Sequence, residues 1–246
     1  MLKRFLQMYK VEQKLFFRSP DVFIFNLCMP VVVLFLIGLI AGDKMAGDSA
    51  MTYLQSTFAA VSAVGICCCA FMSIPIVLVD YRDKKILKRF YCSPCSPLRL
   101  LTADLICSAV LAALSAICVA IVACVVFGYR MQGSVAAYIG VWVLTMLSMF
   151  SIGLLAASVC RTTKSLNVVT SILYFPMLLF SGATIPYELF PEGMQMVVKY
   201  LPLGVGIRAM KAVSMGTEAA IGSELLVLIV IAVVCSLIAV KTFRWE

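Results

Sequence analysis

The side chains that could carry chemistry are few, and several of them lie in one polar stretch, residues 80–99. This stretch contains Cys92 and Cys95, whose Cys-x-x-Cys spacing occurs in redox sites and in half of a zinc site. A structural zinc site needs four ligands, but the chain has no second pair of this kind and no histidine. We therefore interpret the two cysteines as incidental and expect no metal site.

The same stretch has the pattern of an amphipathic helix. Its apolar side consists of Ile86, Leu87, Phe90 and Tyr91, and its basic side of Lys84, Lys85, Lys88 and Arg89. Two Ser-Pro pairs follow and are expected to end the helix. Anchoring to anionic lipid would need only the charge, whereas docking a partner would also use the apolar side. Both interpretations stay open, and the apolar side favours docking.

The elements around this stretch are expected to lie in a membrane. Of the 246 residues, 63% are hydrophobic and only 13% are charged, and the mean hydropathy is +1.06. Soluble domains are about half apolar and about a quarter charged. Long apolar runs, rather than short alternating segments, predict helices, which satisfy their own backbone groups in lipid. The predicted fold is an all-α integral membrane protein with a single domain, residues 1–246.

Six membrane-spanning helices are expected, at about residues 22–42, 53–79, 105–127, 138–159, 166–183 and 224–240. Residues 1–21 are predicted to form an amphipathic helix in the membrane interface. Residues 184–223 are semi-apolar and interrupted by prolines, which predicts short outer re-entrant helices at about 189–200 and 206–213. The alternative is a seventh span that ends near Lys211 and places the C-terminus outside.

The distribution of basic residues predicts the orientation. With both termini in the cytoplasm, 15 of the 20 Lys and Arg residues lie on the inner side. Cytoplasmic loops carry such an excess of positive charge. We therefore expect a multi-pass protein of the cell membrane with residues 80–99 on the cytoplasmic side.

The predicted spans lack ionisable residues in their interiors, and Asp104 and Glu224 are expected at span entrances. Ion-driven pumps need ionisable groups at depth, and membrane hydrolases need an acid, a base or a metal. The chain also lacks a Gly-x-x-x-x-Gly-Lys-Ser/Thr phosphate loop. We expect no enzyme activity and no cofactor in this chain, so that a separate subunit would bind any ATP and Mg²⁺. Nucleic acid is not an expected partner.

Neutral polar residues within the spans could line a path for a solute. The candidates are Asn26, Gln55, Ser62, Ser148, Ser171 and Tyr174. In membrane helices such side chains more often hydrogen-bond to their own backbone or to a neighbouring helix. The absence of charge favours a hydrophobic or amphipathic cargo over an ion.

Three parts of the chain, taken in order, resemble the membrane subunit of ABC exporters of the second type, the ABC-2 type permeases. Residues 17–30 resemble the entry into the first span of that family, and residues 80–90 with Ser93-Pro94 resemble its coupling-helix loop. The third part, residues 180–186 followed by 201–204 and 208–210, resembles the split fifth helix and outer re-entrant helices. Many relatives have Gly-Thr-Leu after an acidic-Arg pair, where this chain has Asp83-Lys84-Lys85-Ile86.

This resemblance implies that an ABC ATP-binding subunit docks on the coupling helix and that two permease subunits, identical or different, pair around a central path. The implied docking residues are Arg82, Asp83, Lys84, Lys85, Ile86, Leu87, Lys88, Arg89 and Phe90. The expected function is the permease of an ATP-driven exporter for a drug, an antibiotic or a lipid-like molecule. The alternatives are an exporter of glycans or lipid-linked saccharides, a non-transporting membrane scaffold, and a passive channel.

Overall fold

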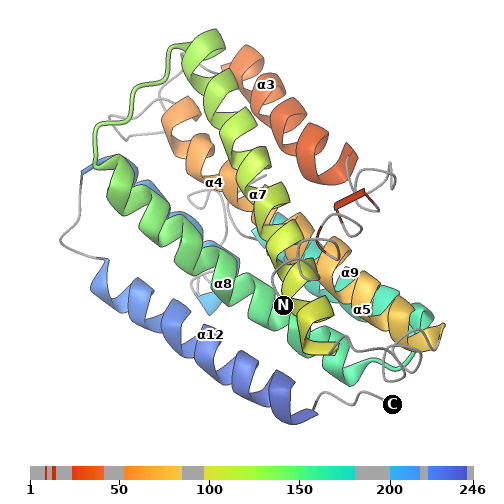
Figure 1. Ribbon diagram of the computed structural model, residues 1–246. Helices are drawn as coiled ribbons and strands as arrows, with labels where there is room; N and C mark the ends of the chain where they lie inside the picture. The colour runs from red at the N-terminus through yellow and green to blue at the C-terminus, as the bar shows by residue number, and fades with distance from the viewer. Residues whose placement is uncertain are drawn as a thin grey trace.

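The computed structural model of the protein describes residues 9, 13–14, 24–41, 53–84, 97–180, 200–216 and 221–242. Within these ranges the regular structure is entirely helical, and the helices form an elongated bundle (Figure 1). The prediction of an all-helical fold is therefore confirmed for the part of the chain that the structure describes.

Five helices of the described part are long and apolar enough to cross a membrane. They are Thr57–Asp83, Leu100–Phe127, Val135–Val159, Thr163–Phe180 and Gly222–Thr242. The segment Asn26–Leu39, in the first predicted span, is a shorter apolar helix. The multi-pass membrane prediction is thus supported by five helices. The six-span count, and the interfacial helix of residues 1–21, stay predictions.

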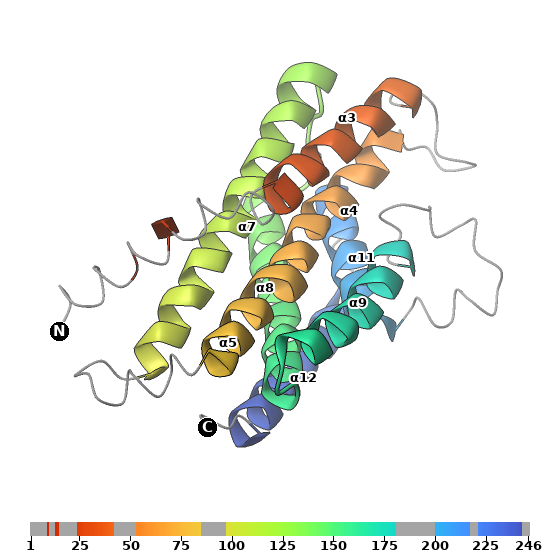
Figure 2. The same cartoon turned by 90° about the vertical axis from the view of Figure 1, so that its right-hand side faces the viewer.

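The first two helical stretches of the described chain each contain a π-helical segment. The first consists of η1 (Ile24–Cys28) and α3 (Met29–Ala41), and the second of α4 (Tyr53–Cys68), η2 (Cys69–Ser73) and α5 (Ile74–Asp83). In Figure 2, α4 and α5 follow one another through the bundle between α7 and α9. The second helical stretch ends at Asp83, four residues beyond residue 79, the predicted end of the second membrane span.

The third long helix, α7 (Pro97–Phe127), begins well before the predicted start at residue 105. A proline fits the first position of a helix because the missing N–H would have no partner there. Asp104 consequently lies two turns inside α7 and is fully buried, at 0% exposure, rather than at an entrance. The helix ends before Gly128, whose φ of +64° is the left-handed conformation that glycine adopts at helix ends.

The remaining long helices lie close to their predicted positions. They are α8 (Val135–Val159), α9 (Thr163–Phe180) and α12 (Gly222–Thr242). Ser134 begins α8 by accepting a hydrogen bond from the Ala137 N–H at 3.4 Å. The α8 helix packs along α12 and also contacts α11 and α5, so it is the central helix of the bundle (Figure 1).

A short helix, α11 (Pro202–Ser214), lies at the second predicted re-entrant position. Most of its residues are buried, and it packs against α8, α12 and α4. The first predicted short helix, at 189–200, lies almost wholly outside the described residues. The re-entrant course of this region therefore stays a prediction.

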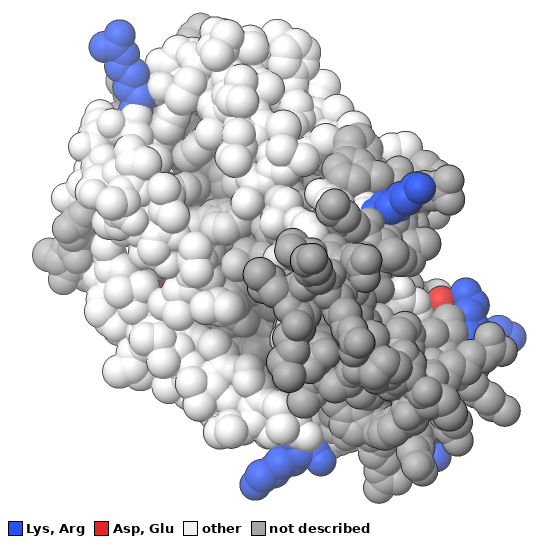
Figure 3. Space-filling model, viewed as in Figure 1, with Lys and Arg blue, Asp and Glu red and all other residues white. Residues whose placement is uncertain are grey.

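The described surface is suited to lipid contact. In the view of Figure 3, the Lys and Arg side chains lie at the margins of the molecule, and the white surface between them is uncharged. Large apolar side chains on α7 and α12 point outward, such as Val125 at 79% exposure and Val240 at 78%. Such apolar exposure would be costly in water and is expected in hydrocarbon.

Candidate functional site

The predicted docking stretch begins in the last turn of α5, where Arg82 holds the end of α8. Its Nη1 donates to the carbonyl oxygens of Ala157, at 3.3 Å, and of Cys160, at 2.9 Å. The last carbonyls of a helix lack donors within that helix, and the C-terminal end carries partial negative charge. The guanidinium therefore satisfies orphan acceptors and binds the end of α8 to the end of α5.

Asp83 binds the beginning of α9 as a hydrogen-bond acceptor. Its Oδ2 accepts from the Thr163 hydroxyl at 3.1 Å and from the Thr163 N–H at 3.5 Å. Thr163 is the first residue of α9, where N–H groups lack helical acceptors and a negative charge is favourable. We call the cluster of Arg82, Asp83, Ala157, Cys160 and Thr163 the α5 junction.

Lys84 lies next to this junction and is the last residue that the structure describes before residue 97. Its ammonium pairs with Asp80 at 2.8 Å, one helical turn away, and its side chain is 64% exposed. Of the nine predicted docking residues, the structure therefore brings Arg82 and Asp83 onto the turn between α8 and α9. The other six, Lys85 to Phe90, lie outside the described residues, and the docking role of the whole set stays a prediction.

Sequence reasoning did not identify the partners of the α5 junction. Thr163 lies in a turn that the sequence does indicate, since residues 160–165 separate two apolar runs. The contacts of Arg82, however, are backbone carbonyl oxygens, which every residue possesses. Only the position at which α8 ends, Val159, could have indicated which carbonyl oxygens lack a donor within the helix.

A second cluster holds α11 at the other end of the bundle. The N–H groups of Gln132 and Gly133, in the loop between α7 and α8, donate to the Ser214 carbonyl oxygen at 3.2 and 3.1 Å. Ser214 ends α11. The Nε of Arg208 lies 3.3 Å from Oε1 of Glu224, which joins α11 to the first turn of α12. We call these five residues the α11 junction.

Close backbone contacts surround the α11 junction. Gly133 lies against the Val213 carbonyl and Gly206 against the Thr145 side chain, and a Cβ at either glycine would overlap its neighbour. Phe58 stacks on Tyr129 with ring centroids 4.6 Å apart, and burial raises the pKa of the Tyr129 hydroxyl. The α11 helix is thus held by packing and backbone hydrogen bonds as well as by one ion pair.

The predicted path residues lie on four different helical elements, η1, α4, α8 and α9, and differ in burial. Asn26, Ser62, Ser148 and Tyr174 are buried, whereas Ser171 is exposed on α9 and the side chain of Gln55 lies outside the described set. The Ser62 hydroxyl donates to the Phe58 carbonyl of its own helix at 2.9 Å, as such groups often do. Asn26 and Tyr174 both contact residues 68–73, from different sides. Their role in substrate binding stays a prediction.

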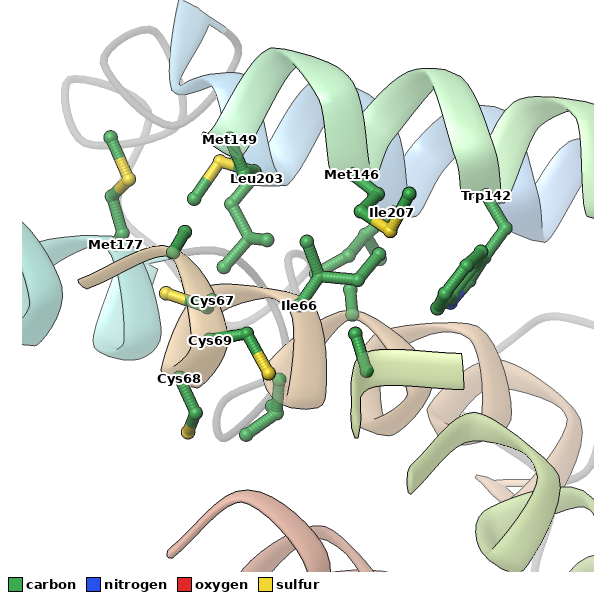
Figure 4. Close-up of a cluster of buried hydrophobic side chains, with 14 of the residues drawn as sticks. Ile66, Cys67, Cys68, Cys69, Trp142, Met146, Met149, Met177, Leu203 and Ile207 are labelled. Carbon is green, nitrogen blue, oxygen red and sulfur yellow. The ribbon is translucent and has the colours of Figure 1, made fainter. Parts of the chain in front are cut away.

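The centre of the bundle is apolar and rich in sulfur. Figure 4 shows Ile66 pointing toward Met146 of α8 and Ile207 of α11, whereas the side chains of Cys68 and Cys69 point away from α8. A separate groove of about 420 Å³ lies between α7 and the segment formed by η1 and the beginning of α3. None of the predicted path residues lines this groove. Among the described residues no group of three or more His, Cys, Asp or Glu side chains could hold a metal ion.

These features define a multi-pass helical membrane protein whose charged contacts lie at the ends of its helices. A family model described as ABC-2 type transporter matches residues 3–215. Because this match covers most of the chain, the protein belongs to the ABC-2 type transporter family, as a membrane permease. It is therefore a transport component and not a catalytic enzyme. No curated protein sequence matches the chain significantly.

Proposed function

We propose that this chain is the permease subunit of an ATP-driven exporter and that a separate ATP-binding subunit docks on residues 82–90. Two observations support a separate energy source: the chain belongs to the ABC-2 family and has no phosphate loop of its own. A second permease subunit, identical or different, would complete the central path. The exporter would act in the cell membrane with both termini in the cytoplasm, as the distribution of basic residues favours.

The α5 junction is the observation that carries this proposal. The chain leaves α5 directly after Asp83, so a displacement of the docking stretch would pull first on the α5 end. Arg82 and Asp83 join this end to α8 and α9 through four hydrogen bonds. Because charge-assisted hydrogen bonds are directional and comparatively strong, the three helix ends would move together. A force applied to the docking stretch outside the membrane would then act on the ends of α5, α8 and α9 at once.

The cargo in this proposal is a hydrophobic or amphipathic molecule, such as a drug, an antibiotic or a lipid. The polar side chains buried between helices in the described part of the spans are neutral except for Asp104, which lies two turns inside α7. A bare ion would need charged or dense oxygen ligands along its path. Stimulation of ATP hydrolysis by amphipathic drugs, but not by lipid-linked saccharides, would separate the two cargo classes.

Copurification tests the docking surface. Ile86→Glu with Phe90→Glu is expected to abolish recovery of the ATP-binding subunit, since it would place two charges on the apolar side of the proposed helix. The matched control is Lys241→Glu with Thr242→Glu, two exposed residues at the end of α12. A complex that survives the first pair intact would rule out docking through this surface.

Transmission through the α5 junction is tested separately. Arg82→Met keeps most of the aliphatic length and removes the guanidinium that binds the end of α8. We expect the ATP-binding subunit to copurify normally, while export per ATP hydrolysed falls about tenfold. Arg161→Met, at an exposed arginine in the adjacent turn, should leave this ratio unchanged. Equal ratios in both variants would contradict a transmitting role for Arg82.

A further inference from the structure

Both π-helical segments of the described chain have a proline at the same distance after them. Pro30 is the second residue of α3, which follows η1, and Pro75 is the second residue of α5, which follows η2. In a regular α-helix each proline ring would clash with the carbonyl four residues earlier, that of Asn26 or of Phe71. A π turn is wider and shifts that carbonyl, and such turns are frequent at functional positions. Both interruptions therefore lie just before a proline, although Pro176 lies inside α9 without such a turn.

The two π segments are joined by one amide. The Cys69 thiol donates to Oδ1 of Asn26 at 3.1 Å, and Nδ2 of Asn26 donates to the Ser73 hydroxyl at 3.4 Å. Cys69 and Ser73 are the first and the last residue of η2. All three side chains are buried. The amide thus spans the whole π turn, and both hydrogen bonds depend on the register of that turn.

Two further helices contact η2 without charged groups. Gly153 of α8 lies against the Ala70 carbonyl, where a Cβ would overlap the oxygen. On another side, the Tyr174 hydroxyl of α9 lies 3.3 Å from the thiol of Cys68, which precedes η2. The contact between Tyr174 and Cys68 is a neutral hydrogen bond, which contributes modestly to stability, whereas the contact of Gly153 is a close approach to the backbone of η2. A rearrangement of η2 would not separate an ion pair within the membrane.

The helices on the two sides of η2 pack against different neighbours. The α4 helix packs mainly against α3, α7 and α11, whereas α5 packs mainly against α8 and α9. The far end of α5 is also fixed to α8 and α9 through the α5 junction. The boundary between these two groups of helices falls at the π turn.

We propose that η2 is a hinge in the Thr57–Asp83 membrane helix and that Asn26 is the latch that holds it in the π form. While both hydrogen bonds are made, α4 and α5 keep their present angle. When they break, the angle between α4 and α5 changes, and the end of α5 carries the ends of α8 and α9 with it through the α5 junction. This inference concerns the permease alone and does not depend on which partner docks below it.

Hydrogen–deuterium exchange of the purified permease in lipid nanodiscs tests the latch. Asn26→Leu replaces the amide by an apolar side chain of similar size and removes both hydrogen bonds. We expect exchange at residues 69–76 to rise at least about tenfold, with the flanking parts of α4 and α5 still protected. Thr170→Val is the matched control, because its buried hydroxyl donates only within α9, to Leu166 and Asn167, and it should change nothing at η2.

Two additional variants separate a latch from a general structural role. Ser73→Ala removes only one hydrogen bond and should give a smaller, equally local increase, which keeps the test valid if Asn26→Leu does not fold. The exchanged pair Asn26→Ser with Ser73→Asn restores an amide–hydroxyl contact across the same interface and should return exchange toward that of the wild type. Unchanged exchange in both single variants, or an increase spread evenly over the helices, would overturn the proposal.

Discussion

The α5 junction and the α11 junction both tie helix ends together, but they do so with different chemistry. At the α5 junction, two neighbouring charged side chains bind two other helices, and Asp83 is exposed. At the α11 junction, backbone N–H groups bind a backbone carbonyl, and glycines allow the segments into direct contact. The first junction is therefore held by two charged side chains, of which Asp83 is exposed and Arg82 is partly buried. The second is held by packed backbone.

This difference predicts which junction costs more free energy of unfolding to disrupt. The exposed Asp83 carboxylate can exchange Thr163 for water at little cost. Close backbone contacts have no such substitute, because opening them leaves voids and unpaired groups. We infer that disrupting the α5 junction costs less free energy of unfolding than disrupting the α11 junction, while the α5 junction still couples the ends of α5, α8 and α9.

The largest effect is expected at the α11 junction. Gly133→Val places a branched side chain where the Val213 carbonyl lies, so the loop and α11 must move apart. Overpacking of this kind typically costs about 1–3 kcal/mol of the free energy of unfolding, and we expect the upper end, about 3 kcal/mol. Thermal or denaturant unfolding in detergent measures the loss.

Gly140→Val provides the control for that measurement. Gly140 lies in α8 and has no atom within 4 Å of an added Cβ. Its substitution should change the free energy of unfolding by less than about 0.5 kcal/mol. Similar losses in both variants would remove the distinction between a packed α11 junction and the open helix surface.

A smaller effect is expected at the α5 junction. Asp83→Ala removes the acceptor of the Thr163 hydroxyl and N–H, and Thr163→Val removes only the hydroxyl donor. Because Asp83 is exposed, we expect each substitution to cost only about 1 kcal/mol. In a double-mutant cycle, a coupling energy of about 0.5–1 kcal/mol would confirm direct contact, and a value near zero would contradict it.

These junctions show what the sequence could and could not reveal. Helix positions follow from apolar runs and their breaks, so the end of α7 before Gly128 and the end of α8 at Val159 agree with prediction. The start of α7 was missed because Arg99, Thr102 and Asp104 are polar and resemble a loop. Burial of Asp104 depends on which segments pack against α7, and a periodic pattern does not contain that information.

The contacts between helices were harder to predict than the helices. Arg82 and Asp83 stand out in the sequence because they are charges beside an apolar run. The partners of Arg82 at the end of α8 are carbonyl oxygens, which leave no trace in residue types. Only the structure shows that a π turn precedes both Pro30 and Pro75 and that Asn26 joins the two turns.

The smallest effect is expected at the ion pair between Arg208 and Glu224, whose side chains are 28% and 23% exposed. Glu224→Gln keeps the shape of the side chain and an oxygen acceptor while it removes the charge. Pairs with this degree of solvent access contribute about 0.5 kcal/mol, so unfolding should shift only slightly. High salt should reduce the difference between wild type and Glu224→Gln, because ions screen such a pair. A loss as large as that of Gly133→Val, insensitive to salt, would mean that charge rather than packed backbone holds α11.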